Sequence, residues 1–269
     1  MYRRARFAYT QKKGGWDCLR HYEIMANGCI PIFRGLDQCP ADTLTTFPKQ
    51  LIREVNQRFE DGTIDDAYYN ACVKQMLDHV RQHCSVSSTA NYFLQKMGNP
   101  TNNRDKPGYR VLMVRCDPGV NYSREMFWIG LHRHITGQPD GVAVEYPRID
   151  YLYDTYSGDK GKLYGNGFTY AGRIRESGQK FSENEIVDKI KSRWFDFVIY
   201  GKVGPDELRD GSMPYLPLWD HVFASYKKPE IAFLYGGDEC IDLTTTNKYS
   251  AHILKHAAYA TCFVRELRR

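Results

Sequence analysis

Residues 12–33 read KKGGWDCLRHYEIMANGCIPIF, and this stretch decides the fold that the sequence predicts. Apolar positions with helical spacing run through Gly15–Asn27, and Gly28 ends the helix. The apolar run Cys29–Phe33 then predicts a buried strand, and Arg6–Thr10 predicts a short strand before the helix. A strand, a helix and a second strand in this order are typical of a parallel sheet.

The rest of the chain continues this alternation. Helical spacing predicts three consecutive helices, at 48–59, 65–84 and 88–97. Five later apolar runs predict strands, at 109–115, 142–145, 195–200, 231–235 and 260–267. Amphipathic segments lie between most of these runs. The expected fold class is therefore α/β, with Rossmann-like parallel sheets.

One segment interrupts the pattern. Gly98–Gly108 reads GNPTNNRDKPG, which is typical of a linker because Gly, Pro and Asn favour turns. We therefore expect an N-terminal segment at 1–98, a linker at 99–108 and a second, Rossmann-like segment at 109–269.

Composition limits the function classes. A net charge of +5 over 269 residues, without a block of like charges, gives little support to a nucleic-acid partner. No apolar run has the length of a membrane span. The eight cysteines are scattered and form no CxxC, which favours free thiols in a reducing compartment. The expected location is the cytoplasm.

The opening block also has the pattern of an anion site. The basic, glycine-bearing loop at 12–15 precedes a helix start, where free backbone N–H groups and the helix dipole favour a phosphate. Arg20 and Glu23 are three residues apart and share a helix face, and a carboxylate there suits the hydroxyls of a ribose. A surface Arg–Glu pair is the competing interpretation. The predicted donor-binding residues are Lys12, Lys13, Gly15, Arg20, His21 and Glu23.

At these residues the chain resembles a known family. GWDCLRHYEIMANGCIPIF, at 15–33, is similar to the donor-binding segment of exostosin-like glycosyltransferases of the GT-B type. The resemblance implies that Glu23 binds the ribose of a UDP-sugar, that Arg20 binds its diphosphate and that transfer inverts the anomeric carbon. A narrower resemblance, to small glycosyltransferases of large algal viruses that include a xylosyltransferase acting on N-glycans, implies UDP-xylose as donor and a viral protein in the host cytoplasm.

The order of segments departs from that family. Its donor segment usually lies toward the C-terminus, after a strand similar to ATCFVREL at 260–267, whereas here it begins the chain. Joining the two chain ends restores the usual order, so we expect a reduced and circularly permuted GT-B fold. Chain ends that lie close together make such a permutation tolerable.

Three carboxylates are candidates for the base that removes the proton of an acceptor hydroxyl. Asp238 and Glu239 follow the predicted strand at 231–235 and two glycines. Asp117 follows the strand at 109–115. Ligands of parallel sheets bind at the carboxyl ends of strands, where all three are expected. A solvated turn is the competing interpretation for each.

No metal or other cofactor is expected, because the sequence contains neither Asp-x-Asp nor His-Glu-x-x-His. His79, His83 and Cys84, and likewise His132 and His134, are better explained as solvated helix faces than as zinc sites. The leading hypothesis is a metal-independent glycosyltransferase that moves a sugar, xylose by resemblance, from a UDP-sugar to a glycan hydroxyl. The alternative is a non-catalytic nucleotide- or glycan-binding domain.

Overall fold

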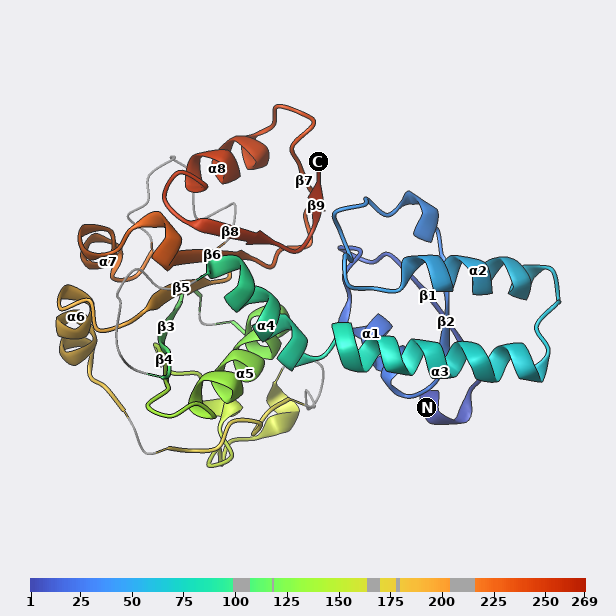
Figure 1. The fold of residues 1–269 in the computed structure, drawn as a ribbon, viewed down its shortest axis with the longest axis horizontal. Helices are drawn as coiled ribbons and strands as arrows, with labels where there is room; N and C mark the ends of the chain where they lie inside the picture. Colours follow the sequence, from blue (N-terminus) through green and yellow to red (C-terminus); the bar gives the residue numbers. More distant parts are fainter. Residues whose placement is uncertain (99–106, 118, 164–169, 178–179, 204–215) are drawn as a thin grey trace. The chain divides into compact units, whose positions relative to one another are not determined.

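The computed structural model describes residues 1–98, 107–117, 119–163, 170–177, 180–203 and 216–269 (Figure 1). Most of the linker expected at 99–108 lies outside them. The chain forms two compact units. Unit 1 comprises Met1–Ser88, Gly237–Thr246 and Arg265–Arg269, and unit 2 comprises Thr89–Gly236 and Asn247–Val264. Two C-terminal segments thus belong with the N-terminal residues, which differs from a simple division into 1–98 and 109–269.

Unit 1 contains the predicted strand, helix and strand. They are β1 (Phe7–Gln11), α1 (Leu19–Ala26) and β2 (Ile30–Arg34), and the two strands pair in parallel. Two longer helices, α2 (Lys49–Glu60) and α3 (Asp66–His83), pack on β2. Their shared core buries Phe33, Ile52 and Met76. Removing these apolar side chains from water is the main contribution to the stability of this unit. Two short 3₁₀ turns, at Tyr2–Arg4 and Leu36–Gln38, complete the N-terminal part.

The strand predicted at 260–267 is in fact two strands. β8 (Thr261–Val264) joins the sheet of unit 2, whereas β9 (Leu267–Arg268) pairs with β7 (Ile241–Asp242) in unit 1. Thr43 fastens β9 to unit 1, because its Oγ1 donates to the carbonyl of Leu267 and accepts from its N–H, both at 2.8 Å. The C-terminal residue Arg269 pairs with Asp42 at 2.7 Å.

Unit 2 contains a five-stranded sheet in which all pairings are parallel. In sheet order the strands are β4 (Val142–Tyr146), β3 (Arg110–Arg115), β5 (Phe197–Gly201), β6 (Ile231–Tyr235) and β8. The chain adds β4 on one side of β3 and then β5 on the other, so the strand order reverses between β3 and β5. The structure thus confirms a mixed α/β fold with parallel sheets.

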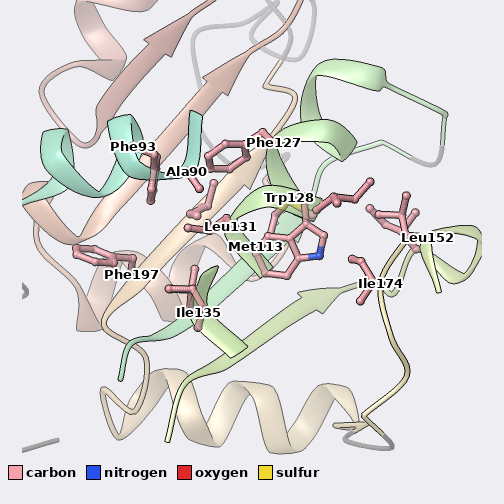
Figure 2. Packing of buried hydrophobic residues seen from close by; sticks show 14 of the residues in the cluster. Ala90, Phe93, Met113, Phe127, Trp128, Leu131, Ile135, Leu152, Ile174 and Phe197 are labelled. Atoms are coloured by element: carbon pink, nitrogen blue, oxygen red, sulfur yellow. The ribbon is translucent and has the colours of Figure 1, made fainter. Parts of the chain in front are cut away.

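Helices cover both faces of this sheet. α4 (Val86–Met97) and α5 (Tyr122–Thr136) pack on one face, where Phe93 and Trp128 meet Met113 and Phe197 in one apolar cluster (Figure 2). On the other face Tyr200 meets Trp219 of α7 (Trp219–Ser225), with ring centroids 5.8 Å apart.

Three further pieces complete the framework of unit 2. α6 (Glu183–Lys191) packs beside α7, and α8 (Lys248–His256) precedes β8. Short 3₁₀ turns lie at Asp150–Leu152, Lys160–Lys162 and Lys228–Glu230. Over the described part of the chain, no helix combines the length and apolar character needed to cross a membrane.

Candidate functional site

Helix α1 presents Arg20 and Glu23 to solvent, on the same face, as their spacing predicts. The helix begins at Leu19 rather than at Gly15, because residues 15–18 form an irregular loop. Cys18 precedes the first helical residue with an extended backbone, and no side chain caps the helix there. The two side chains that the resemblance assigns to a nucleotide are therefore accessible.

His21 occupies the opposite face of α1 and is only 1% exposed. Its Nε2 donates to the carbonyl of Trp16 at 3.0 Å, and its Nδ1 accepts from the hydroxyl of Thr10 at 2.9 Å. Burial lowers the pKa of His21 to about 4, so the ring is neutral at pH 7. His21 thus holds β1 and the loop onto α1, and both of its ring nitrogens already have partners within unit 1.

A buried carboxylate, that of Glu266, accepts hydrogen bonds from backbone N–H groups of the loop before α1. Glu266 is 1% exposed, and its Oε1 accepts from the N–H of Asp17 at 2.7 Å and also from that of Trp16. Its Oε2 has no hydrogen-bond partner within the described residues. Burial raises the pKa of Glu266, although the two N–H groups oppose this shift. A Cβ atom at Gly15 would collide with this carboxylate, which explains the glycine there.

The sequence alone assigns those N–H groups to a phosphate, whereas in the structure a side chain of the protein receives two of them. The cations predicted beside the loop remain available. Lys12 and Lys13 are exposed, and the Lys12 ammonium lies 5.5 Å from the ring centroid of Trp16. The positive charge of this site therefore comes from the side chains of Lys12, Lys13 and Arg20.

The turn after β6 brings a predicted base to the same loop. Asp238 forms an ion pair with Arg265 and packs against Gly14 so closely that a Cβ there would collide with its carboxylate. The side chain of Asp238 is 60% exposed, whereas that of Arg265 is 8% exposed. Glu239 is also exposed, and its carboxylate folds back toward Gly237. Unit 1 thus contains both the predicted donor-binding residues and two of the three predicted bases.

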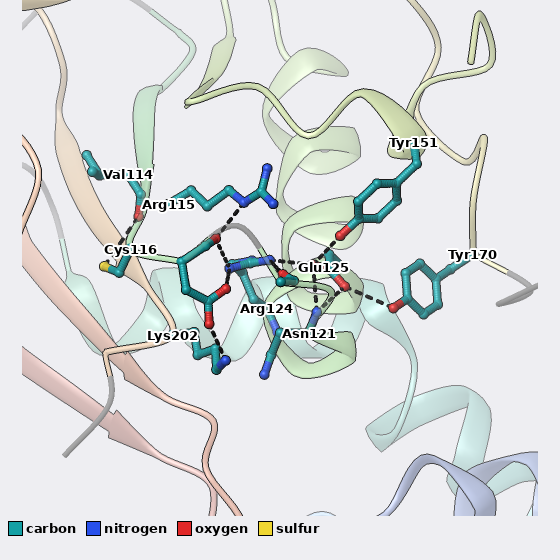
Figure 3. Close-up of polar contacts among 11 residues, drawn as sticks. Val114, Arg115, Cys116, Asn121, Arg124, Glu125, Tyr151, Tyr170 and Lys202 are labelled. Carbon is teal, nitrogen blue, oxygen red and sulfur yellow. Dashed lines mark hydrogen bonds and ion pairs between the residues drawn. The ribbon is translucent and has the colours of Figure 1, made fainter. Parts of the chain in front are cut away.

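Asp117 belongs to unit 2 and forms ion pairs with Arg124 and Lys202, both of which are labelled in Figure 3. Its Oδ1 lies 3.1 Å from Nη1 of Arg124, and its Oδ2 pairs with the ammonium of Lys202. Burial opposes ionisation of Asp117, but the hydrogen bond from Lys202 and the charge of Arg124 outweigh burial and lower its pKa. A carboxylate stabilised in its ionised form in this way is a weak proton acceptor.

Several residues around Glu266, Asp238 and Asp117 could not be predicted from the sequence. Arg265 and Glu266 lie between β8 and β9, inside a run that the sequence predicts as one strand. The proximity of Arg124 and Lys202 follows only from the order of strands in the sheet. Of the histidines expected on solvated helix faces, His79 donates to the carbonyl of Thr46 at 2.7 Å. The expectation is wrong for His132, which is 6% exposed and packs against Trp128 and Tyr153 because its side of α5 faces the core. Among the described residues, no cluster of three or more His, Cys, Asp or Glu side chains is arranged to hold a metal ion.

Comparison with known proteins finds no match for this chain, whether against family models, curated protein sequences or solved structures.

Proposed function

We propose that the chain is a glycosyltransferase that moves a sugar from a UDP-sugar to a glycan hydroxyl, with inversion and without a metal ion. The observation that carries the proposal is the composition of unit 1. Its basic loop and the accessible pair on α1 are neighbours in the sequence, whereas the turn at 238–239 comes from more than 200 residues further along the chain, and its Asp238 lies against Gly14. A diphosphate, a ribose and a reacting hydroxyl need these three kinds of group.

In this proposal each group has one role. Lys12, Lys13 and Arg20 neutralise the diphosphate, where negative charge develops as the leaving group departs. Glu23 accepts hydrogen bonds from the ribose hydroxyls. The acceptor oxygen attacks the anomeric carbon, the bond from that carbon to the diphosphate oxygen breaks, and UDP leaves with the electron pair. Asp238 takes the proton of the acceptor hydroxyl.

Asp238 is the favoured base for two reasons. Its carboxylate is largely exposed and lies in the unit that holds the donor-binding residues, whereas two cations and a lowered pKa make Asp117 a weaker proton acceptor. Glu239 is the second choice, since it is exposed in the same turn.

We also propose that the fold is a reduced and circularly permuted GT-B arrangement. What supports this is the location of the chain ends. Residues 1–88 and 265–269 belong to one unit, and Thr43 and Asp42 contact Leu267 and Arg269 directly. Joining the ends would therefore link segments of a single unit.

The alternative, a nucleotide- or glycan-binding domain without catalysis, also has an observation in its favour. Asp238 forms an ion pair with Arg265, and Asp117 forms ion pairs with Arg124 and Lys202. A paired carboxylate is a weaker base, because its cation stabilises the ionised form. This alternative predicts that UDP binds while UDP-sugars are neither hydrolysed nor transferred.

A thermal-shift panel of UDP-, GDP- and dTDP-sugars, with and without a chelator, tests the proposal. We expect stabilisation by UDP-sugars in both conditions, and its loss in Arg20→Ala and Glu23→Gln. Arg81→Ala and Glu54→Gln are matched controls, because both side chains are exposed on other helices of unit 1. Stabilisation only by GDP-sugars, dependence on metal, or full UDP affinity in the α1 variants would contradict the proposal.

A further inference from the structure

The carboxyl ends of β3 and β5 in unit 2 form a second place where a ligand is expected. In a parallel sheet wound in both directions, ligands bind where the strand order reverses, and here that point lies between these two strands. Arg115, the last residue of β3, is paired in register with Gly201, the last residue of β5. The residues that follow each strand therefore emerge side by side.

Charged side chains meet at this point in an alternating series, Glu125, Arg124, Asp117 and Lys202 (Figure 3). Nη2 of Arg124 lies 2.6 Å from Oε1 of Glu125, and its Nη1 lies 3.1 Å from Oδ1 of Asp117. Asp117 in turn pairs with the Lys202 ammonium. The series thus starts at a fully buried carboxylate and ends at a cation whose side chain is 34% exposed.

The buried end of the series is fixed firmly. Glu125 accepts hydrogen bonds from the hydroxyls of Tyr151 at 2.6 Å and Tyr170 at 2.9 Å, and from the N–H of Asn121 at 2.8 Å. Arg124 also donates to the carbonyl of Gly119 at 2.6 Å. These partners offset much of the penalty for burying the two charges, although Nε of Arg124 has no hydrogen-bond partner among the described residues.

The exposed end is held in an unusual backbone conformation. Lys202 has φ of 59°, in the left-handed region that residues with a side chain rarely adopt. The preceding residue is glycine because a Cβ at Gly201 would lie 2.7 Å from Cδ of Arg124. The end of β5 therefore packs closely against Arg124, and Lys202 follows it directly.

The charges at this point sum to a net positive value. Three cations, Arg115, Arg124 and Lys202, stand against two carboxylates, Asp117 and Glu125, which leaves +1. An ammonium has three N–H donors, and among the described residues the Lys202 ammonium donates to Asp117. An oxyanion can accept the others, and a lysine binds such a group as a point charge.

We propose that this point is a second binding site, centred on Lys202, for a small molecule that carries a phosphate or carboxylate group. Asp117 orients the ammonium, and the buried pair of Arg124 and Glu125 holds Asp117 in place. The site is distinct from the nucleotide site proposed in unit 1 and does not depend on it. It gives Asp117 a positioning role in place of the catalytic role considered above.

Calorimetric titration of the full chain with inorganic phosphate and with acetate, at constant ionic strength set by chloride, tests the proposal. The parent protein for this test carries Lys13→Gln and Arg20→Gln, which removes cations of unit 1 that would also attract an anion. We expect saturable binding of at least one anion, and the arm that binds tells whether the natural group is a phosphate or a carboxylate.

Lys202→Gln in this parent should weaken binding about tenfold, as the loss of one charge-assisted hydrogen bond implies. Lys191→Gln is the matched control, because Lys191 is exposed at the end of α6 in the same unit, and it should bind as the parent does. Circular dichroism verifies that both variants fold. Equal affinities in Lys202→Gln and the parent, or no saturable binding of either anion by the parent, would overturn the proposal.

Discussion

The buried ion pair of unit 2 allows a quantitative prediction. Arg124 and Glu125 have fully buried side chains, and Nη2 of Arg124 lies 2.6 Å from Oε1 of Glu125. Arg124→Met removes one partner and leaves the carboxylate without its cation. Breaking such a pair costs about 3–5 kcal/mol of unfolding free energy. Because two tyrosine hydroxyls and a backbone N–H still bind Glu125, we expect the lower end, about 3 kcal/mol.

The assay is urea denaturation at pH 7, combined with amide hydrogen exchange of α5, which reports on unit 2 even where the two units unfold separately. Arg81→Met is the control, since its pair with Asp78 has side chains that are 70% and 40% exposed. An exposed pair contributes about 0–1 kcal/mol. Arg124→Met combined with Glu125→Gln should recover part of the loss, because Gln still accepts from the tyrosines and carries no charge.

Two results would refute this reasoning. The first is a loss in Arg124→Met no larger than that in Arg81→Met. The second is a double variant that is no more stable than Arg124→Met alone, because the destabilisation would then not come from the uncompensated charge of Glu125.

Three further predictions concern other parts of the chain. Gly201→Ala should cost about 1–3 kcal/mol in urea denaturation, because its Cβ collides with Arg124, whereas Gly119→Ala meets ordinary contact at 3.6 Å and should cost less; equal losses would contradict this. Wild-type stability should fall by about 2 kcal/mol between pH 7 and 4.5 through His21 alone, because burial lowers its pKa to about 4 and the unfolded chain takes up a proton that the folded chain does not. In His21→Gln this share of the pH dependence should disappear, and an unchanged dependence would show that His21 is charged in the folded protein. A permuted chain, with its ends joined by a Gly-Ser linker and opened within 99–106, should keep the circular dichroism and denaturation midpoint of the wild type, and an unfolded product would contradict the permutation.

The sequence predicts the general architecture well, because the spacing of apolar residues and the turn residues between apolar runs determine the secondary structure. The segment at 6–33 forms a strand, a helix and a strand, as predicted, and the strand predicted at 231–235 matches β6 to the residue. Apolar runs of this length, bounded by turn residues, leave little choice of secondary structure.

Tertiary partners decide the features that the sequence does not reveal. Helix α1 starts at Leu19 rather than Gly15, and Glu266, from the far end of the chain, binds the N–H groups of Trp16 and Asp17 in the loop before it. The run at 260–267 looks like one strand, but its two halves pair with different sheets. Periodicity carries no information about such distant partners.

The candidate sites show the same limit. Spacing is sufficient to predict that Arg20 and Glu23 share an accessible helix face. It cannot distinguish His21, whose ring points into the core, from a ligand-binding histidine in the same run. Spacing also cannot predict the ion pair between Asp117 and Lys202, because that pair forms only if β3 and β5 are neighbours in the sheet.

Turnover of UDP-xylose in the presence of a glycan acceptor, followed by proton NMR, shows whether this chain transfers a sugar. We expect UDP and a glycosylated product with an inverted anomeric carbon to appear together, and we expect Arg20→Ala and Asp238→Asn to slow the formation of both. Arg81→Ala should leave the rate unchanged. If UDP binds but no UDP-sugar in the panel is consumed, the chain is a binding domain, and if UDP does not bind, the site assigned to unit 1 is wrong.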